Sequence, residues 1–178
     1  MHTDQQSTLQ KARAIRLLAL DVDGVLTDGK LYFSAQGDEL KAFSILDGHG
    51  IKMLLNNEIE VAIITGRTSP LVARRARDLG ITYILQGRED KKIALQELSE
   101  ELNIPLQNTA YVGDDLPDLS AIISAGLGIC VPNAHSFVKQ HADLCTLASG
   151  GQGAVREVCD LILEAKELLS ALHQTYLT

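Results

Sequence analysis

The sequence predicts an α/β protein built around a parallel sheet, in a single domain that spans residues 1–178. Short apolar runs alternate with longer segments in which apolar residues recur at helical spacing. Hydrophobic residues make up 46% of the chain and charged residues 22%, the proportions of an ordinary globular domain. Strands that alternate with helices of this length form βαβ units, in which the strands are parallel and helices cover both faces.

The expected strands are the apolar runs, taken in chain order. They are Leu17–Val22, Val61–Thr65, Tyr83–Leu85, Thr109–Val112 and Gly128–Val131. Continuous apolar runs of this length are typical of strands buried on both faces. No run reaches the length that a membrane-spanning helix needs, so we expect no membrane segment.

The expected helices lie between and after these strands. They are Gly50–Asn57, Pro70–Leu79, Asp90–Asn103, Leu116–Ala125 and a long closing helix, Ala154–Ala171. Ser69 followed by Pro70 is typical of a helix start, because the serine oxygen can accept a backbone N–H and proline fits the first turn. We expect the first dozen residues and the turn Ser149–Gly153 to be flexible.

One segment departs from the alternation of strands and helices. Lys30–Phe33 and Glu39–Ile45, joined by Ser34–Asp38, are typical of a β-hairpin. The hairpin follows the end of the first strand, so we expect a flap of about residues 29–46 that projects over this strand end. A C-terminal tail would cover about residues 149–178.

Two carboxylates, Asp21 and Asp23, come where the first strand should end. A strand would place both side chains on one face. Like charges so close raise each other's proton affinity unless a cation lies between them. The pattern suits a divalent metal, or a nucleophile beside an acid/base partner. An acidic turn that uses the backbone freedom of Gly24 is the structural alternative.

The other strand ends carry groups that complement these carboxylates, and ligands of open α/β sheets bind at the carboxyl ends of strands. The segments are Thr65-Gly66-Arg67 after the second strand, Lys91 beyond the third and Gly113-Asp114-Asp115 after the fourth. A metal held by Asp21 and Asp114 would attract a phosphate, and a hydroxyl, a backbone N–H and a lysine could bind its oxygens. A carboxylate could then attack phosphorus in line. Each segment alone is also an ordinary turn, so their joint occurrence carries the prediction.

These motifs resemble those of the haloacid dehalogenase-like phosphohydrolase superfamily, and within it the 3-deoxy-D-manno-octulosonate 8-phosphate phosphatases. The closer resemblance covers roughly residues 12–165 and is carried by Asp21–Gly29, Asp47–Ile51, Ile64–Arg67, Gln86-Gly87, Tyr111–Leu116 and Gly150–Cys159. The resemblance implies a Rossmann-like, three-layer doubly wound sheet. It also implies a small hairpin flap in place of a large cap domain.

The resemblance assigns a role to each motif residue. Asp21 would be the nucleophile and Asp23 the acid/base; Mg²⁺ would be bound by Asp21, the backbone carbonyl of Asp23 and Asp114; and Thr65, Gly66, Arg67 and Lys91 would bind the substrate. Lys92 competes with Lys91 for the lysine role, but Lys91 aligns better with the motif. Asp115 and Asp118 are expected to shape the loop or support the site from behind.

The implied activity is the magnesium-dependent hydrolysis of 3-deoxy-D-manno-octulosonate 8-phosphate through an aspartyl-phosphate, in lipopolysaccharide precursor synthesis in the cytoplasm. The family forms homotetramers in which a neighbouring subunit completes each active site, and the flaps pack together at the centre. Gln152 stands where the family commonly has an arginine, which leaves Arg156 as the nearby cation.

The same residues leave other functions open. A phosphatase for a related sugar acid, such as a nonulosonate 9-phosphate, fits the motifs equally well. A phospho-acceptor receiver domain would carry its phosphorylated Asp on the third strand, where Tyr83–Leu85 has no carboxylate. A formal charge of −7 argues against nucleic acid as a partner. The three cysteines are widely spaced, which argues against a structural zinc site and favours a reducing compartment. The N-terminal residues lack the pattern of a signal peptide, so we expect none.

Overall fold

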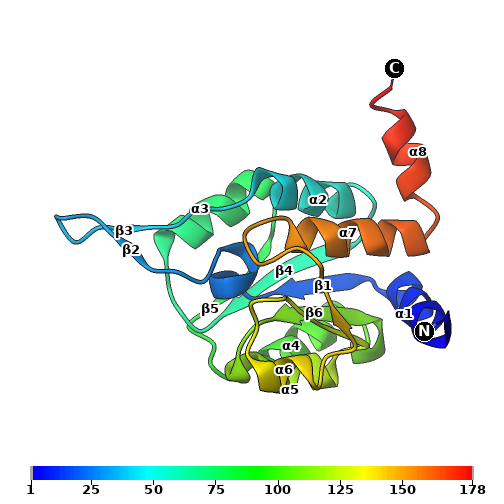
Figure 1. Cartoon of the computed structure of the whole chain (residues 1–178), viewed down its shortest axis with the longest axis horizontal. Helices are drawn as coiled ribbons and strands as arrows, with labels where there is room; N and C mark the ends of the chain where they lie inside the picture. Colours follow the sequence, from blue (N-terminus) through cyan, green and yellow to red (C-terminus); the bar gives the residue numbers. More distant parts are fainter. Residues whose placement is uncertain (1, 178) are drawn as a thin grey trace.

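The structure, a computed structural model, describes residues 2–177 and has three layers (Figure 1). The strands of the central sheet are β1 (Leu17–Leu20), β4 (Glu60–Thr65), β5 (Tyr83–Gln86), β6 (Thr109–Gly113), β7 (Leu127–Cys130) and β8 (Leu144–Cys145). Their order is β5-β4-β1-β6-β7-β8, and all neighbours are parallel. This is a doubly wound sheet whose order reverses between β1 and β6. The predicted fold class is confirmed, and β8, which is too short to show in the sequence, is added.

Strand β1 lies at the centre of the sheet, between β4 and β6. All four of its residues are buried. Because helices cover both faces of the sheet, side chains pointing either way must be apolar, which explains the continuous run in the sequence. The strand ends at Leu20, two residues earlier than predicted, so Asp21 lies at its carboxyl end.

Helices α2 (Ile45–Leu55), α3 (Pro70–Leu79) and α7 (Ala154–Ala165) lie on one side of the sheet. Helices α4 (Lys91–Glu101), α5 (Leu119–Ser124) and α6 (Ser136–Lys139) lie on the other (Figure 1). Helix α1 (His2–Ala14) packs against α7, and α8 (Leu169–Gln174) follows at the C-terminal end. In residues 2–177 no helix combines the length and apolar character needed to cross a bilayer.

Helix α3 has the bounds that the sequence predicts. The Leu71 N–H donates to the Ser69 hydroxyl oxygen at 3.3 Å, and Pro70 begins the helix. Gly80 ends it with a φ of 83°, a left-handed conformation in which glycine avoids the strain of a side chain. Strong local signals at both ends therefore fix this helix.

Helix α2 begins at Ile45, five residues before the predicted start at Gly50. Ser44 caps it by accepting the Asp47 N–H at 3.4 Å. Its glycines allow close packing: a Cβ at Gly48 would lie 2.3 Å from Arg75 Nη2, and one at Gly50 would lie 2.9 Å from Arg156 Cδ. Tertiary packing thus requires glycines that reduce the helical propensity of the segment.

Both ends of the chain depart from the prediction. Of the first dozen residues, expected to be flexible, residues 2–12 belong to helix α1, because Ala12 buries its side chain and Ile15 continues the same contact with the core; residue 1 lies outside the described residues. The long closing helix is broken at Lys166–Leu168 into α7 and α8, and Glu167 has a φ of 63°. Leu168 packs against the core at this turn.

The predicted flap is confirmed as a hairpin of β2 (Tyr32–Phe33) and β3 (Glu39–Leu40), which projects away from the sheet (Figure 1). Its strands are shorter than predicted, and the chain after Leu40 runs on toward the Ser44 cap of α2. The flap exposes several apolar side chains: Leu31, Tyr32, Phe33 and Leu40. In the described residues, this hairpin is the one β-structure between β1 and α2.

Candidate active site

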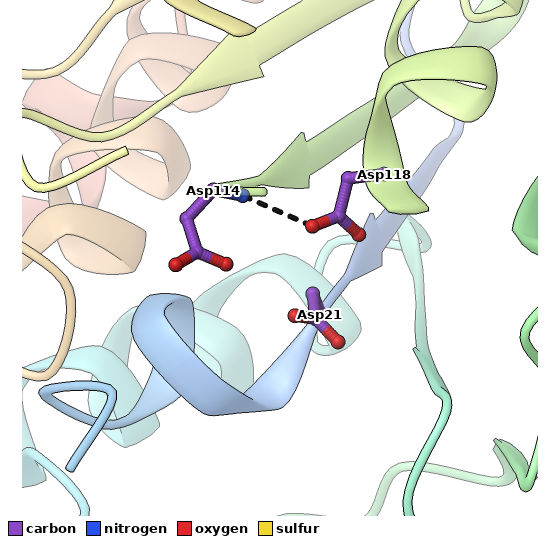
Figure 2. A group of neighbouring side chains, drawn as sticks. All are labelled: Asp21, Asp114 and Asp118. Carbon is purple, nitrogen blue, oxygen red and sulfur yellow. Dashed lines mark hydrogen bonds between the residues drawn. The ribbon is translucent and has the colours of Figure 1, made fainter. Parts of the chain in front are cut away.

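The carboxyl ends of the central strands bring three aspartates together. Asp21 follows β1, Asp114 follows β6, and Asp118 lies four residues beyond Asp114. One carboxylate oxygen from each lies within 4.8 Å of the other two. Figure 2 shows the three side chains converging on one space at the end of the sheet. The predicted acidic site is present, with Asp118 as a member.

Asp118 is buried and its carboxylate is fully engaged by hydrogen-bond donors. One oxygen accepts from Lys91 Nζ at 2.6 Å and from the Tyr111 hydroxyl at 2.8 Å. The other accepts the backbone N–H groups of Asp114 and Asp115, each at 3.1 Å. Asp118 therefore positions Lys91 and the loop that carries Asp114, in keeping with its predicted supporting role.

Lys91 is the cation of this cluster. Its Nζ lies 2.9 Å from Asp21 and 2.6 Å from Asp118, and only 5% of its side chain is exposed. Lys92 is exposed. Of the two neighbouring lysines weighed from the sequence, Lys91 is the one that reaches the site.

The site holds more negative charge than Lys91 can balance, and the pKa values reflect this. The pKa of Asp21 is raised from 3.8 to about 7, first by burial and second by the charge of Asp118. The pKa of Asp114 is raised to about 7, first by burial and second by Asp21. Burial alone would lower the pKa of Lys91, but the charges of Asp21 and Asp118 outweigh it and raise that pKa.

These residues fit a divalent cation. Carboxylate oxygens are the ligands that Mg²⁺ prefers, and Asp21 and Asp114 present them around one space. Gly24 leaves room beside them, because a Cβ at this position would lie 2.0 Å from Asp114 Oδ2. A bound cation would relieve the repulsion that raises both pKa values.

Asp23 lies apart from this cluster. The chain turns irregularly at Val22–Leu26, where Gly24 has a φ of 95°. The two carboxylates therefore do not share one strand face as the spacing suggested, and each has its own cation: Asp21 pairs with Lys91 and Asp23 with Lys41 of the flap. This separation allows the two groups to do different chemistry.

The second motif begins at the end of β4, beside β1. Thr65 is the last residue of β4 and is buried. Gly66 lies against the Glu89 carboxylate, since a Cβ there would lie 2.6 Å from Glu89 Oε1. Arg67 reaches the flap, where its Nη2 donates to both oxygens of Glu39 at 3.0 and 3.1 Å.

Hydrogen bonds join the glycine-rich turn Ser149–Gly153 to the irregular turn Val22–Leu26. The Gly150 N–H donates to Asn133 Oδ1 at 2.8 Å, and Asn133 Nδ2 donates to the Gly24 carbonyl at 2.9 Å. The Gly151 N–H donates to the Val25 carbonyl at 2.9 Å. The turn that we expected to be flexible is thus fixed by hydrogen bonds, and a Cβ at Gly150 would lie 1.8 Å from the Gly24 oxygen.

Gln152 and Arg156, the two tail residues singled out in the sequence, have separate surroundings. Gln152 is exposed. Arg156 donates its backbone N–H to Asp47 at 2.8 Å and its side-chain Nε to Asp160 at 2.8 Å. Asp47 thereby binds the first turn of α7 from the neighbouring helix α2.

Sequence reasoning missed three residues of the site: Lys41, Tyr111 and Asn133. Lys41 and Tyr111 reach the site from a flap and from within a strand, where the local sequence gives no chemical signal. Asn133 follows the end of β7, and the rule that ligands bind at strand ends could have indicated it.

Comparison with known proteins places the chain among phosphatases. A family model described as haloacid dehalogenase-like hydrolase matches residues 80–158. The 3-deoxy-D-manno-octulosonate 8-phosphate phosphatase of Escherichia coli (strain K12) is 52% identical over 158 residues, which are 89% of this chain and 84% of that protein. The phosphatase of the same name from Yersinia pestis is 48% identical over 161 residues, 90% of this chain and 86% of that protein.

Solved structures agree with the sequence comparison. The phosphatase of this name from Moraxella catarrhalis, in complex with magnesium, phosphate and KDO, superposes with a TM-score of 0.94 at 48% identity, covering 96% of this chain and 98% of that one. The cobalt-bound phosphatase from Haemophilus influenzae gives 0.90 at 40% identity, covering 95% and 100%. The chain therefore belongs to the family of 3-deoxy-D-manno-octulosonate 8-phosphate phosphatases, within the haloacid dehalogenase-like hydrolases.

Proposed function

We propose that this protein hydrolyses 3-deoxy-D-manno-octulosonate 8-phosphate to the free sugar acid and inorganic phosphate, with Mg²⁺ as its cofactor. One observation carries the proposal: at the carboxyl ends of β1 and β6, the carboxylates of Asp21 and Asp114 lie close together, and Lys91 forms an ion pair with Asp21. Its substrate is inferred from relatives that carry this name and are about half identical over most of the chain.

Two side chains and one backbone carbonyl would hold the metal. The ligands are Asp21, Asp114 and the carbonyl oxygen of Asp23, while Asp118 keeps its bonds to Lys91 and Tyr111. When bound, the cation supplies positive charge that favours the ionised form of Asp21 and attracts the phosphate.

The remaining groups would hold the phosphate for in-line attack. Lys91 already lies 2.9 Å from Asp21, so its ammonium can contact a phosphate oxygen beside the nucleophile. The Thr65 hydroxyl and the Gly66 N–H reach the same end of the sheet from β4. Arg67, now paired with Glu39, would contact the sugar beyond the phosphate.

The reaction then has two steps. In the first, an oxygen of Asp21 bonds to phosphorus, the bond from phosphorus to the sugar oxygen breaks, and this oxygen takes a proton from Asp23. In the second, Asp23 takes a proton from water, the water oxygen bonds to phosphorus, and the bond to Asp21 breaks to free phosphate. Separate surroundings for Asp21 and Asp23 support this division of roles.

The test is a phosphate-release screen with Mg²⁺ across sugar-acid phosphates and simple hexose phosphates. We expect the highest kcat/KM for the eight-carbon octulosonate 8-phosphate, and loss of activity when the metal is chelated. Equal or higher kcat/KM for a nonulosonate 9-phosphate would replace the proposed substrate by this second candidate. Asp21→Asn serves as the control for contaminating phosphatases.

We propose further that the protein works as a homotetramer in the cytoplasm, in lipopolysaccharide precursor synthesis. The exposed apolar side chains of the flap support the assembly, since Phe33 is 63% and Leu40 58% exposed on short edge strands. Light scattering coupled to gel filtration would measure the mass. We expect four copies for the wild type and fewer for a Phe33→Ser variant; a monomeric wild type would contradict the proposal.

A further inference from the structure

The flap places a buried lysine against the acid/base carboxylate. Lys41, one residue beyond β3, forms an ion pair with Asp23, and only 3% of its side chain is exposed. Lysine is almost never buried unless it is paired, because its ammonium loses hydration. The contact spans 18 positions of sequence and joins the end of the flap to the catalytic turn.

Lys41 is itself held by a second flap residue. Glu39, two positions earlier in β3, has its carboxylate 3.4 Å from Lys41 Nζ. The same carboxylate pairs with Arg67 at 3.0 Å. A chain of alternating charges therefore runs from Asp23 through Lys41 and Glu39 to Arg67, and it ties the flap to the ends of both β1 and β4.

The Asp23 side chain needs such a partner. It projects from an irregular turn rather than from a strand, and the ion pair with Lys41 is the contact that holds its carboxylate. A proton donor must lie within hydrogen-bond reach of the leaving oxygen, and a displacement of about 1 Å can lower a rate about 100-fold.

We infer that Lys41 is a positioning residue for Asp23: its ammonium, held by Glu39, fixes the carboxylate in the orientation that transfers protons to and from the substrate. This inference rests on the acid/base role proposed above for Asp23. It goes beyond that role because it makes the ion pair between the flap and Asp23 a requirement of proton transfer, in addition to any contact with the sugar.

Two substrates distinguish the effect of Lys41 on the first chemical step from its effect on the second. A sugar alkoxide is a poor leaving group and needs the proton of Asp23, whereas p-nitrophenolate leaves without one. Both substrates share the second step, in which Asp23 activates water. Misplacing Asp23 should therefore slow both steps with the sugar phosphate but only the second step with p-nitrophenyl phosphate.

The experiment compares Lys41→Met with Lys30→Met, a matched change of an exposed flap lysine that pairs with Asp28 at 3.6 Å. On the octulosonate 8-phosphate we expect Lys41→Met to lower kcat by about 10- to 100-fold and to change KM by less than about threefold. With p-nitrophenyl phosphate, stopped flow should show a first burst of p-nitrophenolate at the wild-type rate, followed by slower turnover. Lys30→Met should match the wild type in every measurement.

A double-mutant cycle with Asp23→Asn completes the test. If Lys41 acts through Asp23, adding Lys41→Met to Asp23→Asn should lower kcat by less than about threefold. Three results would overturn the inference. They are losses of kcat that add fully in the double variant, a p-nitrophenolate burst slowed as much as the sugar-phosphate reaction, and wild-type kcat in Lys41→Met. Wild-type kcat in Asp23→Asn alone would overturn the proposed acid/base role instead.

A separate control shows whether each variant is folded. Thermal unfolding is followed for each variant, and Lys41→Arg restores a cation on a side chain of similar length. Recovery of at least about a third of the lost kcat in Lys41→Arg supports the inference. Equal losses in Lys41→Arg and Lys41→Met, with both folded as the wild type, count against it.

Discussion

The acidic cluster predicts that the metal-free protein loses stability as the pH rises. The pKa of Asp21 is raised from 3.8 to about 7, and that of Asp114 is also raised to about 7. The folded state therefore holds protons that the unfolded state releases between about pH 4 and pH 7. For a carboxyl group with a raised pKa, the stabilising contribution is complete below the unfolded pKa and is lost as the pH rises through the folded one.

The size of the effect follows from the same shifts. Each proton held only by the folded state lowers the free energy of unfolding by about 1.4 kcal/mol per pH unit. For Asp21, which is buried, the loss between the two pKa values amounts to about 4 kcal/mol. Asp114 is partly exposed, so solvent screening makes its share smaller. Between pH 5 and 6 we therefore expect a slope of about −1.4 to −2.7 kcal/mol per pH unit, which falls to about half as the pH reaches 7.

Urea unfolding in chelator at several pH values between 5 and 8 measures this slope, with and without saturating Mg²⁺. The metal binds the ionised carboxylates, so its stabilising effect should grow with pH and flatten the curve. Asp114→Asn should reduce the metal-free slope, and Asp78→Asn, an exposed carboxylate on α3, should leave it unchanged. A metal-free free energy that is flat or rises from pH 5 to pH 7 would refute the assignment of these charges.

The remaining predictions concern single residues of the site. Asp21→Asn should reduce phosphate release to background, and Asp118→Asn should reduce it less, because the remaining amide oxygen can still accept from Lys91 and Tyr111; the reverse order in kcat would contradict these roles. Gly24→Ala should lower kcat by about 100-fold or more, since the new Cβ displaces Asp114 and the φ of 95° strains alanine, and full activity of this variant would be incompatible with the geometry. Asn133→Ala should cost about 1–3 kcal/mol of unfolding free energy, because it removes the partner of the Gly24 carbonyl, and unchanged urea unfolding would show that the bridge contributes nothing.

Local signals in the sequence were sufficient for most of the fold. Helix α3 carries a serine cap, a proline and a final glycine, and its predicted bounds match the structure. The five predicted strands are present because buried parallel strands need continuous apolar runs. Helix α2 was predicted too short, since Gly48 and Gly50 disfavour a helix locally and are required by packing that only the tertiary structure shows.

The site was predictable where its residues follow strand ends. Asp21, Thr65 and Asp114 all lie at the carboxyl edge of the sheet, a position that topology alone dictates. The contact of Lys41 with Asp23 was not predictable, because it depends on where the chain leaving the flap passes the turn Val22–Leu26. The pairing of Asp118 with Tyr111 likewise joins a loop to a buried strand residue, which no spacing rule connects.

The central claim, that phosphate passes through Asp21, is tested by trapping the phosphoenzyme. Asp23→Asn is mixed with p-nitrophenyl phosphate and Mg²⁺, quenched in acid and digested, and the peptides are analysed by mass spectrometry. Because this leaving group needs no proton and the variant is slow to activate water, one phosphoryl group should accumulate on the peptide that contains Asp21. Release of p-nitrophenolate without any phosphoryl group on Asp21 would contradict the account.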